Sequence, residues 1–137
     1  MYGNEAVDCG GAQMRAVCRQ LATVVTVTGD ITETNVDHIS AYTRRFVLSE
    51  KPFVLDLTGV NSLSPEGISL LYTIDENCQH ADVEWTVVAS QPVNRTLRLF
   101  GEGETFPIVG SVAEALHNFA DSINARRRLL PLLTKTA

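Results

Sequence analysis

Apolar residues recur along the chain with two different periods, and the period changes from one segment to the next. The runs MRAVCRQ (14–20) and TVVTVTGDI (23–31) flank a short break and are rich in β-branched residues, so they predict two adjacent antiparallel strands. The run FVLDL (53–57) is almost continuously apolar, as in a central strand covered on both faces. VEWTVVAS (83–90) and FPIV (106–109) predict two further strands.

After these strands, apolar residues recur every three or four positions, which indicates amphipathic helices. Thr34 is expected to cap the first helix, with Asp37 three residues later. Pro92 stands in the first turn of a short helix, and Ser111 with Glu114 reads as a capping box for the last one. The positions expected to face the core in the four helices are Val36, Ile39, Thr43 and Phe46; Ile68, Leu71, Ile74 and Cys78; Val93, Leu97 and Phe100; and Val112, Leu116, Phe119 and Ile123.

The predicted order of elements is β, β, α, β, α, β, α, β, α, which gives an α/β fold class. Strands alternating with helices imply a mixed, mostly parallel sheet with an antiparallel N-terminal strand pair and helices packed against it. Residues 14–123 are expected to form a single domain. Residues 1–13, which are small and polar, are expected to be a flexible leader. Residues 124–137 read as a basic and then apolar tail, in which Pro131 should prevent a long helix.

The composition narrows the classes of protein that fit this pattern. The chain has 137 residues, 45% hydrophobic and 20% charged, as in an ordinary globular domain with its own core. Its net charge of −5 argues against direct nucleic acid binding. Apolar stretches are shorter than the roughly 20 residues that cross a bilayer, and no secretory pattern opens the chain. We therefore expect a cytoplasmic protein without a transmembrane segment.

Candidate chemistry is sparse. Three cysteines without a CxxC motif make no disulfide framework, although Cys9 and Cys18 could pair under oxidation. His38, His80 and His117 are isolated in sequence, so no metal site is expected. There is no GxxxxGK[ST] motif and no legible catalytic constellation. We therefore expect neither a cofactor nor enzymatic activity.

The stretch NSLSPEGISLL (61–71) follows a predicted parallel strand, and functional sites of α/β sheets tend to lie at the carboxyl ends of strands. Ser64 as an N-cap, Pro65 at the first helical position and Glu66 near the positive end of the helix dipole all favour a helix start. Gly67 is expected to permit the close approach of a neighbouring backbone.

The order of elements and four local motifs resemble the STAS domain family, the fold of bacterial anti-sigma factor antagonists. These motifs are VTVTGDIT, VLDLTGVNSLSPEGISLL, VVASQPVNRTLRLFG and FPIVGSVAEAL, and the resemblance covers residues 14–123. It implies a non-enzymatic protein-interaction module. Such a module binds an anti-sigma factor, which can itself be a serine kinase, and so regulates sigma-dependent transcription.

The resemblance fails at the family's switch, so the phosphorylation motif is degenerate. Pro65 stands where the family has the serine that its partner kinase phosphorylates to break the complex. Ser64 stands at the preceding Asp and Glu66 at the second serine, while Thr32 replaces the Asp of a Gly-Glu-Leu-Asp stretch. Pro65 has no hydroxyl, so the resemblance implies no acceptor at that position.

The resemblance places the partner-binding surface at Thr32, Ser62, Ser64, Pro65, Glu66 and Gly67. Two other interpretations of the motif stay open. Glu66 could imitate a phosphoserine in part, because a carboxylate carries less charge than a phosphate. Ser64 could be a displaced phosphorylation site.

Alternatives to the anti-sigma partner also stay open. The basic and apolar tail would suit a soluble STAS subunit of a membrane transporter complex. A small-ligand-sensing STAS module is another class, which a ligand-dependent rise in melting temperature would identify. The oligomeric state also stays open between a monomer and a weak dimer.

Overall fold

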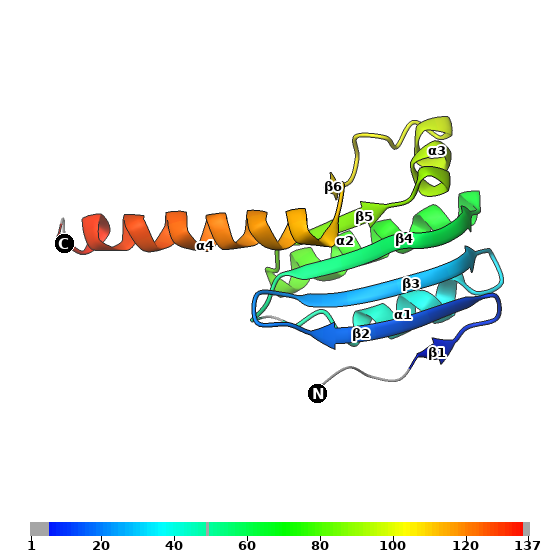
Figure 1. The fold of residues 1–137 in the computed structure, drawn as a ribbon, viewed down its shortest axis with the longest axis horizontal. Helices are drawn as coiled ribbons and strands as arrows, with labels where there is room; N and C mark the ends of the chain where they lie inside the picture. Colours follow the sequence, from blue (N-terminus) through cyan, green and yellow to red (C-terminus); the bar gives the residue numbers. More distant parts are fainter. Residues whose placement is uncertain (1–5, 49, 136–137) are drawn as a thin grey trace.

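A computed structural model describes residues 6–48 and 50–135, with side chains up to Arg127 (Figure 1). It contains one six-stranded sheet in the order β1-β2-β3-β4-β5-β6, in which β1, β2 and β3 pair antiparallel and β3 to β6 pair in parallel. The expected α/β class and the antiparallel N-terminal pair are therefore confirmed. The strands are β1 (Val7–Asp8), β2 (Ala12–Cys18), β3 (Thr23–Ile31), β4 (Phe53–Leu63), β5 (Trp85–Ala89) and β6 (Ile108–Val109).

Helices cover both faces of this sheet. The helices are α1 (Val36–Arg44), α2 (Ile68–Ala81), α3 (Gln91–Leu99) and α4 (Val112–Lys135), and a short 3-10 turn, η1 (Pro65–Gly67), precedes α2. Figure 1 shows α1 and α2 on one face of the sheet and α4 on the other. The central strand β4 serves both layers, because Phe53 and Leu55 join the core of α1 and α2 while Val54 packs with Phe119 of α4. The prediction of a central strand covered on both faces is confirmed.

Residues 7–13 do not form the expected flexible leader, because residues 7–8 form β1, residues 12–13 begin β2, and residues 9–11 connect the two strands. Gly10 and Gly11 form the turn between β1 and β2 with φ angles of 58° and 98°, in the region that favours glycine. The turn folds the chain back, and Cys9 is buried at 5% exposure. Residues 1–5 lie outside the described part of the chain.

The expected break in the tail is also wrong, because α4 runs from Val112 to Lys135 and passes through Pro131. A proline inside a helix removes one backbone hydrogen bond and crowds the carbonyl four residues earlier. Pro131 is close to the end of α4, so only the last turn of the helix depends on the missing hydrogen bond. Arg126 lies on α4 as well, where it forms an ion pair with Glu84. The boundary between residues 123 and 124 is therefore no break in the backbone.

Two helix-end predictions also need correction. Phe100 was expected to face the core, but α3 ends at Leu99, and Phe100 leaves the helical conformation and is 53% exposed. Thr34 does not cap α1, which begins after Asn35, and the Thr34 hydroxyl instead shares a hydrogen bond with the Thr32 hydroxyl (Oγ1 to Oγ1, 2.8 Å). Helical spacing alone does not show where a helix stops.

The three cysteines differ in their surroundings. Cys78 lies in the core, as predicted, and burial, followed by the charge of Asp75, raises the pKa of its thiol to about 12. Burial also raises the pKa of Cys9. Cys9 lies beside Ala12 at the start of β2, where its backbone N–H donates to the Ala12 oxygen at 2.8 Å, and Cys18 is the last residue of that strand. At strand spacing the length of β2 separates them by roughly 20 Å, so they cannot pair in this fold.

Asn35 joins three segments at one edge of the sheet. Its side chain is 3% exposed, and its Oδ1 accepts a hydrogen bond from the Thr32 backbone N–H at 2.8 Å. Its Nδ2 donates to the backbone oxygens of Gly10 at 3.0 Å and Asp30 at 2.8 Å. The amide thus links the β1–β2 turn, the end of β3 and the start of α1.

We expect Asn35→Ala to lower the free energy of unfolding by about 2–4 kcal/mol, because it leaves buried backbone groups without partners. Urea unfolding followed by circular dichroism measures this change. Asn61→Ala is the matched control, since Asn61 is exposed and its loss should change the free energy by less than about 0.5 kcal/mol. If the two substitutions lowered the free energy of unfolding equally, the hydrogen bonds of Asn35 would contribute no more to stability than an exposed asparagine does.

Candidate partner-binding site

The parallel pairing of β3 with β4 brings the predicted site residues together at one edge of the sheet. Asp30 is aligned with Ser62 and Ile31 with Leu63, so Thr32 and Ser64 follow neighbouring strand ends. The Ser62 hydroxyl donates to the Asp30 carboxylate at 2.8 Å. β4 extends to Leu63, so residues 60–63 belong to the strand.

The segment from Ser64 to Gly67 is a capped helix start. Ser64 is in an extended conformation, and its Oγ accepts a hydrogen bond from the Gly67 backbone N–H at 3.1 Å. Pro65 and Glu66 are exposed in the turn η1, and the Ser69 hydroxyl donates to the Glu66 backbone oxygen at 2.7 Å. The predicted capping by Ser64 and the predicted place of Pro65 are therefore confirmed.

Gly67 is buried and does not reach the surface of this edge. A Cβ atom built on it would lie 2.6 Å from the Leu63 Cδ1 and 3.0 Å from the Ile31 Cγ2. Gly67 does have close neighbours, as expected, but they are the side chains of Leu63 and Ile31 at two strand ends and not a neighbouring backbone. Gly67 therefore lets the turn pack onto β3 and β4.

Two residues of the α3 region, which sequence reasoning did not assign to the site, hold the same edge in place. The Ser90 hydroxyl donates to the Val60 backbone oxygen at 2.8 Å, and the Thr96 hydroxyl donates to the Leu63 backbone oxygen at 3.0 Å. Ser90 also caps α3. The Ser90-x-Pro92 pattern identifies the cap in the sequence, but no local pattern shows the bonds to β4.

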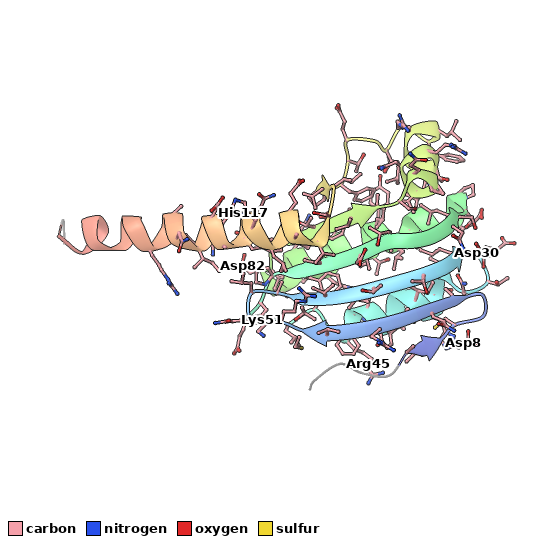
Figure 2. The ribbon with its side chains drawn as sticks, viewed as in Figure 1. Asp8, Asp30, Arg45, Lys51, Asp82 and His117 are labelled. Atoms are coloured by element: carbon pink, nitrogen blue, oxygen red, sulfur yellow. The ribbon has the colours of Figure 1, made fainter. Side chains whose placement is uncertain are left out.

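The surface of this edge is acidic and rich in hydroxyl groups. Asp30, Glu33 and Glu66 are exposed, while Thr32 and Ser64 are half-buried. Figure 2 shows Asp30 at the end of β3, on the side where α3 lies. Such a surface suits contact with a protein that presents basic or hydrogen-bonding groups.

The described residues show no group of three or more His, Cys, Asp or Glu side chains placed to hold a metal ion. Within the same residues, no helix combines the length and the apolar character that crossing a membrane requires.

Comparison with known proteins supports the interpretation of the fold. The chain is 49% identical over 140 residues to osmosensory protein A of Mycobacterium tuberculosis, which covers 98% of this chain and 89% of that protein. The structure is similar to an anti-sigma factor antagonist from Mycobacterium paratuberculosis, with a TM-score of 0.67 and 24% identity over 80% of this chain and 94% of that one. It also resembles the anti-sigma factor antagonist SpoIIAA in its unphosphorylated form, with a TM-score of 0.64 and 10% identity over 79% and 96%.

At 24% and 10% identity, the similarity to these two solved structures shows a shared fold and nothing more specific. The family assignment depends instead on the sequence, since residues 13–115 match the STAS domain. The matched range contains all six residues of the predicted partner-binding surface, Thr32, Ser62, Ser64, Pro65, Glu66 and Gly67. The chain therefore belongs to the STAS domain family.

Proposed function

We propose that this STAS domain is a non-enzymatic interaction module that binds an anti-sigma factor through the carboxyl edge of β3 and β4. The observation that carries the proposal is the geometry of this edge, in which Ser64, Gly67 and Thr96 hold the backbone around an exposed Pro65-Glu66 turn. Two solved structures with this fold are described as anti-sigma factor antagonists, which supports the class of partner.

The relative that is 49% identical is named an osmosensory protein, which supports placing this interaction in a response to osmolarity. The proposed switch differs from that of the family, since Pro65 offers no hydroxyl for phosphate. Nearby hydroxyls are already engaged, because Ser62 donates to Asp30, Ser64 caps η1 and Ser69 donates to Glu66. The binding surface thus keeps its shape and is uncoupled from phosphorylation at position 65.

Capture of binding partners from the native cell tests the interaction. The full chain should retain an anti-sigma factor, and Ser62→Arg should abolish capture, because a long cation at the exposed strand end would meet the partner. Asn118→Arg is the matched control, since Asn118 is exposed on α4, over the other face of the sheet, and this change should leave capture intact. A membrane transporter subunit in place of an anti-sigma factor would refute the proposal.

Incubation with the anti-sigma partner and ATP should add no phosphate to residues 60–67 of the natural chain, as mass spectrometry would show. The triple change Ser64→Asp, Pro65→Ser and Glu66→Ser should create an acceptor, at a cost of at most about 1–2 kcal/mol from altered capping. A control that carries Pro65→Ala in place of Pro65→Ser, with the other two changes kept, should gain no phosphate. Phosphate on Ser64 in protein purified from its own cells would contradict the uncoupled switch.

Glu66→Gln distinguishes a helix-start residue from an imitation of phosphoserine. Glu66 is exposed in the first turn, so its charge contributes little, and we expect the partner dissociation constant to change by less than about threefold, or roughly 0.7 kcal/mol. Titration calorimetry measures this, with Glu33→Gln as the control for loss of an exposed charge at the same edge. Binding tightened by about tenfold, or roughly 1.4 kcal/mol, would instead mean that Glu66 holds the protein in its released state.

A further inference from the structure

A groove with a volume of about 630 Å³ lies where α4 leaves the body of the domain. Its apolar lining comes from Phe119 and Ile123 of α4 and from Pro52 and Val83, which precede the parallel strands β4 and β5. Phe119 is buried, whereas the other three are half-buried. Figure 1 shows that α4 continues well beyond this point, away from the sheet.

Some of the acidic side chains on the rim of the groove have no positively charged partner within the described part of the chain. Glu84 is paired with Arg126, and the Lys51 ammonium donates to the Arg19 backbone oxygen at 2.6 Å. Glu50 and Asp82 also line the groove and are exposed, and neither forms an ion pair with any side chain that the structure describes. A segment that fills this groove should therefore combine apolar residues with positive charge.

The chain itself contains such a segment. Beyond Ile123, α4 reads NARRRLLPLLTK (124–135), with three consecutive arginines followed by four leucines within five positions. The side chains of residues 124–127 are exposed. In the sequence, Leu130 and Leu133 follow Phe119 and Ile123 at helical spacing, so the apolar periodicity of the groove wall continues into this segment.

We propose that a second copy of the chain occupies the groove, with residues 127–133 of each copy lying antiparallel along α4 of the other. Phe119 and Leu133 are equally distant in sequence from Arg126, and Ile123 and Leu130 nearly so. If two α4 helices pair antiparallel about a two-fold axis at Arg126, Leu133 of one copy lies beside Phe119 of the other, and Leu130 lies beside Ile123. The two-fold axis repeats both contacts.

This arrangement satisfies the requirements of a closed dimer. The same surface of both copies takes part, so the contact is self-complementary and adds no further subunits. It also brings the arginines of one copy to the acidic rim of the other, while Arg126 stays paired with Glu84 in its own copy. The interface is independent of the anti-sigma proposal, because it uses the opposite edge of the sheet.

Sedimentation equilibrium of the full chain tests the inference. The natural protein should sediment at twice the 15.0 kDa mass of the chain. The double change Leu130→Glu and Leu133→Glu should raise the dimer dissociation constant by about a hundredfold or more, since it places carboxylates at the centre of an apolar contact facing an acidic rim. Leu99→Glu is the matched control, because Leu99 is 76% exposed on α3, outside the proposed contact, and should leave the dimer unchanged.

A second substitution keeps the test valid if the leucine variant folds poorly. Arg127 is exposed, so Arg127→Glu should leave the melting temperature within about 2 °C while weakening the dimer by about tenfold. A natural chain that stays at 15.0 kDa throughout a dilution series would overturn the inference. So would a dimer that both variants leave intact, or a monomer that binds anionic phospholipid vesicles through residues 126–133.

Discussion

The parallel pairing of β3 with β4 is the interaction on which the rest of the structure depends. Near their starts both strands are apolar on both faces, with Val24 and Val54 toward α4 and Val25 and Leu55 toward α1 and α2. Burial of these two faces drives the pairing. Toward the strand ends the register shifts twice, between Thr26 and Thr28 and between Gly29 and Asp30, and these irregularities leave Ile31 aligned with Leu63 just before η1. A different alignment at the strand ends would separate Thr32 from Ser64, because these residues directly follow the aligned pair Ile31 and Leu63.

The functional edge inherits its geometry from this register. The hydroxyl groups of Ser62, Ser64, Ser90 and Thr96 all make hydrogen bonds within the chain, and three of them bind backbone groups of β4 or η1. Their role is to hold the strand ends and the turn in place. A proline at position 65 is compatible with this role, because the first position of a helix needs no backbone N–H donor. Pro65 thus fits the turn that the Ser64 side chain caps.

The two proposed interactions lie at opposite ends of the sheet. Figure 2 shows Asp30 at the carboxyl edge of the parallel strands, and Lys51 and Asp82 at the other edge, beside the groove under α4. A dimer formed through α4 would leave the Pro65-Glu66 turn accessible. Each dimer would then present two partner-binding surfaces, which would raise its apparent affinity for a partner that is itself dimeric.

The sequence by itself determined the features that depend on neighbouring residues. The apolar periods predicted the order of strands and helices, Ser64 and Pro65 predicted the helix start, and the stripe ending at Cys78 predicted the buried face of α2. Only the tertiary structure decided the role of Asn35, which binds Gly10 25 residues away, and the neighbours of Gly67, which come from two strand ends. Capping and periodicity are properties of adjacent residues, whereas these contacts exist only once distant segments have been brought together by the sheet.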